Sequence, residues 1–279
     1  MVTEVKMKIV EVNVQEMYNM SEKAYRSFLD KIDESLNPRS HEMLYDKFSD
    51  LIDNPNINVL DAGCRDARHL IELAERHSGS FKGIDIVEMN IKEANQAINE
   101  KKLEERVDVR LGDLMSTPYE KEAFDLIWCR DVLGHMEDLK GTFDEFYRVL
   151  KPGGKAMIFL VTSTELLTDD EADFLCKPLA TYKENIDPRK FEDSFEAAGF
   201  KCIEKDIVAS EWRESAEETG RNISSKQLMR IAKLTRNKEA YIKEFGETLY
   251  AVELSNCYYG VYQMFGKLCP IVYTIEKSI

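Results

Sequence analysis

The chain has 279 residues and a formal net charge of −14, from 38 Lys and Arg against 52 Asp and Glu. This length suits one large domain, or a domain with a substantial insertion. A hydrophobic fraction of 43% with only seven Pro and thirteen Gly excludes a disordered or fibrous chain. The acidic balance argues against general nucleic-acid binding, which needs a basic surface to neutralise phosphates.

The N-terminus and the apolar runs predict neither secretion nor membrane insertion. Residues 1–14 lack the basic start and continuous apolar core of a signal peptide. The longest apolar run, 156–161, falls far short of the roughly 18 residues that span a bilayer. The six cysteines form no CxxC pair, and the four histidines make no metal-ligand spacing with them. We therefore expect reduced thiols, no metal, no membrane contact and a cytoplasmic location.

Residues 1–54 are predicted to be helical. Apolar side chains recur at helical spacing over 25–32, and again over 44–52. Asn37-Pro38 separates the two helices. We interpret residues 1–54 as an N-terminal helical lid, in which Tyr18 and Tyr25 either close over a substrate pocket or pack in an ordinary core.

Further along the chain, short apolar segments alternate with helices of ten to fifteen residues, which predicts a parallel sheet with helices on both faces. A doubly wound layout is the default topology for such a pattern. Pro270 indicates an edge or bulge position in the final strand. Residues 210–266 are predicted to be a mostly helical insertion. The expected strands are 58–62, 81–86, 107–111, 124–129, 155–162, 201–209 and 268–275.

Ligands of open α/β sheets bind beyond the carboxyl ends of the strands, so the residues that follow each strand form one group. The first strand is followed by Asp61-Ala62-Gly63, where glycine permits close approach of the backbone to a ligand. Asp85 ends the second strand, about twenty residues later, where a carboxylate can accept from two ribose hydroxyls. Gly112-Asp113-Leu114 follows the third strand, and Arg130-Asp131 ends the fourth.

Together these stretches resemble the class I S-adenosylmethionine-dependent methyltransferases. The matching residues, in the family's order and spacing, are VLDAGC (59–64), GID (83–85), GDL (112–114), FDLIW (124–128) and LKPGG (150–154). The resemblance covers roughly residues 55–162. It implies a Rossmann-like α/β fold with a seven-stranded sheet whose last strand is antiparallel. The domains would then be the lid, a cofactor-binding domain of residues 55–209 and 267–279, and a substrate-side helical cap of residues 210–266.

The resemblance also implies S-adenosylmethionine as cofactor, S-adenosylhomocysteine as product, and a role for individual residues. Asp61 and Gly63 would form the loop that faces the methionine part of the cofactor. Asp85 would hold the ribose, and Ile86 would pack on the adenine. Asp113 would accept from the adenine amino group, beside Leu114.

Two arginines complete the implied cofactor site. Arg130 would place its backbone carbonyl near the cofactor's ammonium, and Arg39 could clamp the cofactor carboxylate. The loop departs from the family pattern D-x-G-C-G-x-G, because Arg65 and Ala67 replace the second and third glycines. We expect Arg65 to have a negative φ with its side chain pointing outward, and Ala67 to begin a helix, where alanine is favourable. Cofactor binding would then survive in a weaker form.

Candidate catalytic and substrate-side residues each have an ordinary structural alternative. His135 either takes a proton from the acceptor or starts a helix. Asp131 is interpreted as an ion-pair partner of Arg130 or Arg65. Aromatic residues of the insertion, Tyr258 and Tyr262 above all, either enclose the acceptor or form core, and the same alternatives hold for Trp128.

Residues 221–243 carry seven Lys and Arg against Glu239 alone. This basic segment is either a solvated helix face or a site for an anionic group of the substrate.

The function predicted from these features is direct methyl transfer from S-adenosylmethionine to a small-molecule acceptor. Alternatives are carbon methylation of an isoprenoid diphosphate, a non-catalytic cofactor-binding module, and a nicotinamide dehydrogenase, although the G-x-G-x-x-G loop of the last is missing. We expect no nucleic-acid partner. A homodimer is left open.

Overall fold

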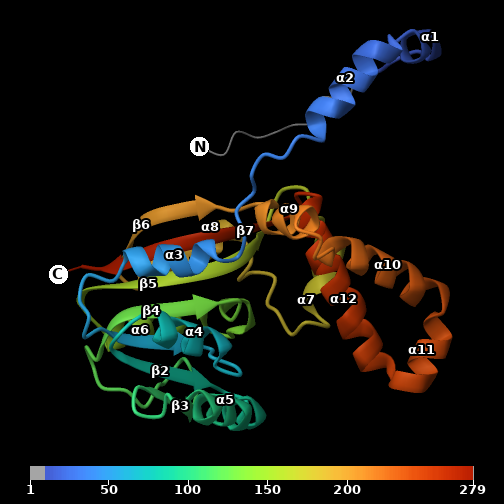
Figure 1. Ribbon diagram of the computed structural model, residues 1–279. Coiled ribbons are helices and arrows are strands. Elements are labelled where there is room, and N and C mark those ends of the chain that lie inside the picture. The colour runs from blue at the N-terminus through green and yellow to red at the C-terminus, as the bar shows by residue number, and fades with distance from the viewer. Residues whose placement is uncertain (1–9, 279) are drawn as a thin grey trace. The chain divides into compact units, whose positions relative to one another are not determined.

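The computed structural model describes residues 10–278, which contain a single seven-stranded sheet (Figure 1). The strand order is β3-β2-β1-β4-β5-β7-β6, and only β7 runs antiparallel to its neighbours, as predicted. The strands are β1 (Asn58–Ala62), β2 (Ser80–Asp85), β3 (Val107–Leu111), β4 (Phe124–Arg130), β5 (Leu150–Ser163), β6 (Phe200–Ile207) and β7 (Leu268–Lys277).

Side chains alternate across the sheet and divide the core into two hydrophobic clusters. On β5, Met157, Phe159 and Val161 belong to one cluster, whereas Ala156, Ile158 and Leu160 belong to the other. The first cluster is covered by α3 (Met43–Asp50), α4 (Arg68–Arg76) and α5 (Glu88–Lys101). The second is covered by α6 (Leu139–Val149) and α8 (Pro188–Ala197). The helices thus cover both faces, which confirms the doubly wound prediction.

The chain divides into two compact units after Pro38, not after residue 54. In the first unit, α1 (Val14–Tyr18) and α2 (Glu22–Ile32) begin at the side-chain caps Asn13 and Ser21. Helix α3 belongs to the second unit, because Leu44 and Phe48 on its inner face are fully buried in the core. The predicted lid boundary was therefore too late by one helix.

The predicted insertion forms four helices between β6 and β7. They are α9 (Glu211–Glu218), α10 (Ile223–Arg236), α11 (Lys238–Phe245) and α12 (Glu247–Met264). In Figure 1 they lie beside the end of the sheet to which the arrowheads of β4 and β6 point. A further helix, α7 (Asp169–Cys176), precedes α8 and contacts α12. The insertion therefore stands where the carboxyl ends of the parallel strands open.

Two details of the strands differ from the prediction. Pro270 lies in a central strand, paired with Val161 of β5, and not at an edge. Its missing N–H is tolerated because β6 has already ended on its other side, where the Pro270 carbonyl accepts from the backbone N–H groups of Val208 and Ala209. Strand β5 begins at Leu150, five residues earlier than predicted, because Leu150 pairs with Phe124 across an irregular register.

All six cysteines are free thiols, as predicted. Between residues 10 and 278, no helix combines the length and the apolar character needed to cross a membrane.

Candidate functional site

Two cavities open at the carboxyl ends of the central strands, and they share one wall. The smaller, of about 390 Å³, is lined by the β1 loop and by Asp85, Val132 and His135. The larger, of about 730 Å³, lies between α3, β5 and the helices α9 and α12. The shared wall consists of Arg68, His69, Arg130 and Asp131. A ligand in one cavity would therefore face a ligand in the other across these four side chains.

The β1 loop turns through three residues in the left-handed backbone region. Gly63 has φ +83°, and a Cβ built there would lie 2.7 Å from Val132. Arg65 and Ala67 also have positive φ, +48° and +57°. The expectation of a negative φ at Arg65 and a relaxed helix start at Ala67 was therefore wrong. The loop keeps the conformation for which glycine is suited, although two of its three positions carry side chains.

Asp85 organises this loop and the start of α5. Its Oδ2 accepts from the backbone N–H of Arg65 at 2.9 Å, and its Oδ1 accepts from the Val87 N–H and the Asn90 amide. A carboxylate has about four acceptor sites, so roughly one stays open. Ile86, the predicted adenine contact, is 70% exposed beside it.

Asp61 is buried at the end of β1. Its side chain is 2% exposed, and within the described residues its Oδ2 has no hydrogen-bond partner. Burial, together with the nearby Asp85 carboxylate, raises the pKa of Asp61 to about 8. At neutral pH this carboxyl group therefore holds a proton.

Asp113 and Leu114 follow β3 as predicted, but their side chains are engaged elsewhere. Asp113 Oδ1 accepts from the Met115 N–H at 2.9 Å. Leu114 is only 5% exposed, because it packs in the core cluster under β1 and β4. The Leu114 side chain thus serves the core, and the adenine roles of both residues stay predictions.

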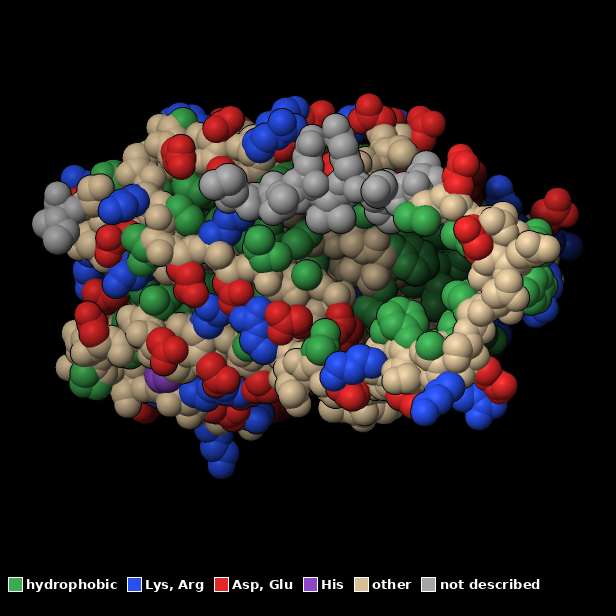
Figure 2. All heavy atoms as spheres, turned by 90° about the horizontal axis from the view of Figure 1, so that it is seen from above, with side chains coloured by type: hydrophobic (Ala, Val, Ile, Leu, Met, Phe, Trp, Pro, Cys, Tyr) green, Lys and Arg blue, Asp and Glu red, His purple; other side chains and the backbone are tan. Residues whose placement is uncertain are grey.

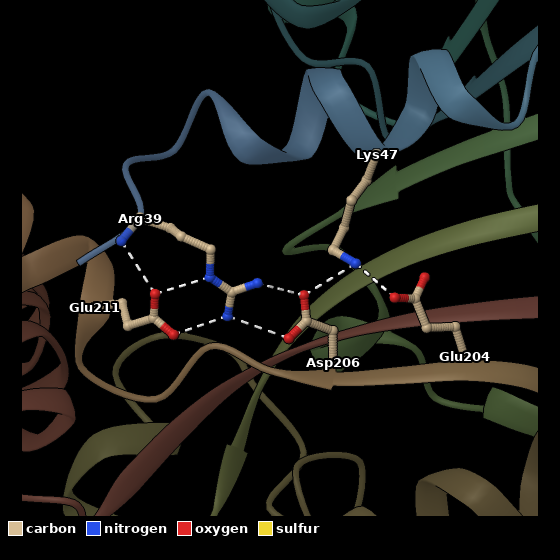
Figure 3. A network of polar contacts seen from close by, with 5 residues as sticks. All are labelled: Arg39, Lys47, Glu204, Asp206 and Glu211. Carbon is tan, nitrogen blue, oxygen red and sulfur yellow. Dashed lines mark hydrogen bonds and ion pairs between the residues drawn. The ribbon is translucent and has the colours of Figure 1, made fainter. Parts of the chain in front are cut away.

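The Arg39 guanidinium donates hydrogen bonds to two protein carboxylates, so it is not free to bind a cofactor carboxylate in this structure (Figure 3). Its guanidinium donates to Glu211 of α9 and Asp206 of β6, both at 2.7 Å, and Lys47 also contacts Asp206 at 3.0 Å. Hydrogen bonds to the two carboxylates hold the pKa of Arg39 well above its usual value. The structure therefore assigns Arg39 to anchoring the segment before α3.

A hydrogen-bonded chain runs through the shared wall. Arg130 Nη1 lies 3.1 Å from His69 Nε2, and His69 Nδ1 lies 2.6 Å from the Tyr45 hydroxyl. Burial and the adjacent Arg130 lower the pKa of His69 to about 3, so its ring is neutral. Since arginine only donates, Nε2 is the acceptor and Nδ1 carries the hydrogen that is donated to Tyr45.

Asp131 stands between the two cavities with φ +56°, a conformation that Asp and Asn adopt more readily than most residues. Its contact with Arg130 Nε is long, 3.8 Å, although the predicted pairing is present. Partial desolvation by the cavity walls raises the pKa of Asp131 to about 6, although 45% of its side chain stays exposed.

His135 lines only the smaller cavity, from the 3₁₀ turn η1 (Leu133–His135). Its Nδ1 donates to the Ala180 carbonyl at 2.9 Å. This contact leaves Nε2 of the neutral ring as its acceptor, and the catalytic role stays a prediction.

The larger cavity combines aromatic and cationic groups. Trp212 stacks on Phe159 with ring centroids 4.2 Å apart, and Arg130 lies 5.4 Å from the Trp212 ring. Arg213 and Tyr259 complete this part of the wall. Trp212 and Arg213 were missed by sequence reasoning, because no motif marks them and only the packing of α9 against β5 brings them to the cavity, whereas Tyr259 was among the aromatic residues of the insertion that were considered.

The predicted aromatic residues of α12 face another way. Tyr258 contacts Phe174 of α7 with ring centroids 5.2 Å apart, and the Tyr262 hydroxyl donates to Glu171 at 3.1 Å. The residues of α12 that line the cavity are Tyr259 and Gln263, one position further along the helix. Trp128 likewise belongs to the core, where it is 1% exposed and stacks on Tyr45.

Tyr18 and Tyr25 are exposed on the first unit, and their closure over a pocket stays a prediction.

The basic segment 221–243 reaches the larger cavity only through Arg221 and Ile223. Along α10, Lys226 Nζ donates to the Arg221 carbonyl, and Arg230 pairs with Glu253 at 3.1 Å. The segment is thus mainly an exposed helix face. No group of three His, Cys, Asp or Glu side chains with the geometry of a metal site occurs among residues 10–278.

The comparison with family models decides the identity of this site. Residues 60–158 match the family described as "Methyltransferase domain". The chain carries a class I S-adenosylmethionine-dependent methyltransferase domain. The methyltransferase domain thus spans β1 to β5 and contains the Asp61 loop, Asp85 and the shared wall.

Known relatives and solved structures agree with this assignment. The chain is 29% identical over 180 residues to "Methyltransferase GfsG" of Streptomyces halstedii, which covers 63% of each chain. The structure resembles the [4+2]-cyclase SpnF, with TM-score 0.69, 22% identity and coverage of 88% and 86%. It also resembles the geranyl diphosphate C-methyltransferase of Streptomyces coelicolor, solved with Mg²⁺, geranyl diphosphate and S-adenosylhomocysteine, with TM-score 0.64, 12% identity and coverage of 85% and 80%. At these low sequence identities, the two structural similarities show a shared fold.

The match to curated relatives is partial. The chain spans 63% of the length of the methyltransferase of Streptomyces halstedii and 32% of the length of a sterol 24-C-methyltransferase of Debaryomyces hansenii.

Proposed function

We propose that this protein transfers a methyl group from S-adenosylmethionine to a small-molecule acceptor. The observation that carries this proposal is the pair of adjoining cavities, which meet at Arg68, His69, Arg130 and Asp131. The smaller cavity contains the methyltransferase-family loop and Asp85, so it would hold the cofactor. The larger, at about 730 Å³, has the size of a small-molecule pocket, and its walls combine aromatic with charged side chains.

The residues of the smaller cavity fit such a cofactor. Gly63 has no Cβ where one would collide with Val132, which keeps the loop open to the ligand. The unpartnered Oδ2 of Asp61 offers a buried polar group beneath it. Asp85 fits with one adjustment. For its carboxylate to accept from both ribose hydroxyls, the Asn90 side chain must turn away, since the other two donors are backbone groups.

S-adenosylmethionine, when bound, supplies a methyl group on a sulfonium that is already electrophilic. The main task of the protein is then to align the acceptor and exclude water, and orientation alone can lower a barrier by about 7–11 kcal/mol. The Arg130–His69–Tyr45 chain fixes the side chains of the shared wall. Asp131 would accept the proton when the acceptor is a hydroxyl or an amine, because it is largely ionised above pH 6.

Three alternatives remain open to test. Carbon methylation of an isoprenoid diphosphate would require the basic segment, of which Arg221 is the cation that reaches the cavity. A function without methyl transfer is motivated by the side chains at Arg65 and Ala67 and by the structural similarity to the [4+2]-cyclase SpnF. A nicotinamide dehydrogenase would bind NAD, which a binding assay with labelled NAD tests.

Calorimetry with S-adenosylmethionine, followed by an assay of S-adenosylhomocysteine formation on a broad acceptor panel, separates these alternatives. We expect cofactor binding and turnover of a small-molecule acceptor. A lack of binding at millimolar cofactor would overturn the enzyme proposal. Binding without turnover on any acceptor would favour the binding module.

The predicted cytoplasmic location, the homodimer and the lack of a nucleic-acid partner also stay predictions. On the face seen in Figure 2, acidic and basic side chains are interspersed, with no large area of a single sign. This mixture, with the net charge of −14, supports a small-molecule acceptor rather than a polyanion.

A further inference from the structure

The larger cavity holds a guanidinium that forms no close ion pair with a carboxylate among residues 10–278, although Asp131 and Glu217 act on it from further away. Arg213 of α9 donates through Nη1 to Gln227 Oε1 at 2.8 Å and through Nε to Gln263 Oε1 at 3.4 Å. Both partners are uncharged amides. Within residues 10–278 no Asp or Glu oxygen lies within 4 Å of this guanidinium, and burial lowers the pKa of Arg213. Among the described residues its Nη2 group has no hydrogen-bond partner, so we expect it to donate to a ligand.

Among the described residues, two of the three other arginines that line this cavity contact a carboxylate, whereas Arg213 does not. Arg68 is paired with Asp66 at 2.6 Å, and Arg130 contacts Asp131 at 3.8 Å. Arg221 at the cavity rim contacts His41 at 3.4 Å, and desolvation lowers the pKa of that histidine. Arg213 and Arg221 are therefore cations of the cavity that lack a carboxylate partner in the described part of the chain.

The cavity lining as a whole is cationic in an acidic protein. Four arginines line it against the two carboxylates Glu72 and Asp131, although the chain carries a net charge of −14. A buried guanidinium without a counter-ion is costly, and an anionic ligand removes that cost while forming charge-assisted hydrogen bonds. The lining therefore favours an acceptor with a negative charge.

The rest of the wall indicates the body of that acceptor. Trp212 precedes Arg213 and stacks on Phe159, and Tyr259 closes the opposite side from α12. Trp212 Nε1 is buried and has no hydrogen-bond partner within the described chain, so the Trp212 ring contributes to the wall by its face. Flat apolar groups pack favourably against such rings, while their acidic group reaches the guanidinium.

On the basis of the proposed methyltransferase function, we propose that the acceptor is a small aromatic acid whose carboxylate binds to Arg213. Arg221 provides a second cation at the rim, and the atom to be methylated faces Asp131 at the shared wall. A carboxylate is proposed rather than a phosphate or diphosphate because the Asp131 and Glu217 carboxylates already offset part of the charge of Arg213, so that a single negative charge suffices.

The test compares matched pairs of acids and amides, such as 4-hydroxyphenylacetate with its amide and indole-3-acetate with its amide. Binding to the wild-type protein saturated with S-adenosylhomocysteine is measured by calorimetry, with phenyl phosphate as a third arm. We expect each acid to bind at least about tenfold more tightly than its amide, which is the gain expected from a charge-assisted hydrogen bond. This comparison on the wild-type protein needs no variant to fold.

Arg213→Gln should remove the preference for acids, and Arg213→Lys should retain part of it. Arg189→Gln is the matched control, since Arg189 is an exposed arginine of α8 outside both cavities. Equal affinity for acids and amides across the panel, with S-adenosylhomocysteine still bound, overturns this inference and leaves the proposed function intact. Tighter binding of phenyl phosphate that depends on Arg213 also overturns the carboxylate assignment. Failure of the wild type to bind S-adenosylhomocysteine contradicts the proposed function itself.

Discussion

The backbone N–H of Arg65 donates to Oδ2 of Asp85 across 2.9 Å, so the β1 loop is tied to the carboxylate at the end of β2. Arg65 replaces a glycine of the family loop and yet has φ +48°. The hydrogen bond helps hold this unfavourable conformation. A single carboxylate thus both shapes the loop and provides the predicted ribose contact.

We predict that Asp85→Ala weakens the affinity for S-adenosylmethionine by at least about tenfold, the loss expected for a charge-assisted hydrogen bond. The substitution removes the ribose acceptor and releases the Arg65 N–H. Calorimetry on the purified variant measures the change. Asp108→Ala is the control, because Asp108 on β3 forms only exposed ion pairs with Lys82 and Arg110. An unchanged dissociation constant for Asp85→Ala would refute the ribose assignment.

The loop conformation predicts that two substitutions stabilise the fold. In the left-handed region a side chain costs about 1–2 kcal/mol, which glycine avoids. Arg65→Gly should therefore raise the free energy of unfolding by up to about 1 kcal/mol, after the added entropy of the unfolded chain is deducted. Ala67→Gly should gain less, because it also removes a methyl group that is fully buried in the core. The melting temperature should rise by about 2–4 °C per kcal/mol in a protein of this size.

Ala74→Gly serves as the matched control for these two variants. Ala74 is buried inside α4, where glycine costs roughly 1 kcal/mol relative to alanine. Its melting temperature should fall. If the melting temperatures of Arg65→Gly and Ala67→Gly fall as much as that of Ala74→Gly, the positive φ values do not describe the loop in solution.

The sheet and the cofactor loop were predictable, because their signals are local. A short apolar run marks β1 at 58–62 and alternating apolar residues mark β3 at 107–111, with the bounds that the structure has. The left-handed conformation of Arg65 and Ala67 was not predictable from residue type, because tertiary contacts with β2 overrule local preference. The family pattern of three glycines was the signal that could have revealed it.

The residues that line the acceptor cavity were harder to predict from the sequence. On α12, residues 258 and 262 share one face and residues 259 and 263 share the next, so a pattern of tyrosines cannot show which face meets the cavity. Arg213 and Phe159 come from distant segments and meet only through the packing of α9 on β5. The Arg39 contact with Asp206 is equally remote, since 167 residues separate them.

Asp131 predicts a pH dependence for the methyl transfer reaction. Its pKa of about 6 lies above the usual value, so the carboxylate is protonated below pH 6 and cannot accept a proton. For a hydroxyl or amine acceptor, kcat/KM should rise with pH up to about 6 and then level off. Asp131→Asn should lower kcat/KM by about 10²–10⁴ and remove this rise, while asparagine still tolerates φ +56°.

S-adenosylhomocysteine formation between pH 5 and 8 measures this profile on both proteins. His135→Gln is the informative comparison, because His135 lines the cofactor side of the same wall. If His135→Gln removes the rise and Asp131→Asn retains it, His135 is the base and the assignment of Asp131 is wrong.

The last prediction concerns Arg39, which contacts two carboxylates and no cavity. Arg39→Ala leaves Asp206 and Glu211 without their shared cation, so we expect a loss of about 1–3 kcal/mol, reduced from the cost of a fully buried pair because Arg39 is partly exposed. Thermal unfolding measures the loss. The double variant Arg39→Ala/Glu211→Ala should lose less free energy of unfolding than the two single variants together. The reason is that the second substitution removes the Glu211 carboxylate that the first one leaves unpaired. Calorimetry with S-adenosylmethionine completes the test: an anchoring role predicts a dissociation constant within about twofold of wild type, whereas a loss of tenfold or more would identify Arg39 as the cofactor clamp that the family resemblance suggested.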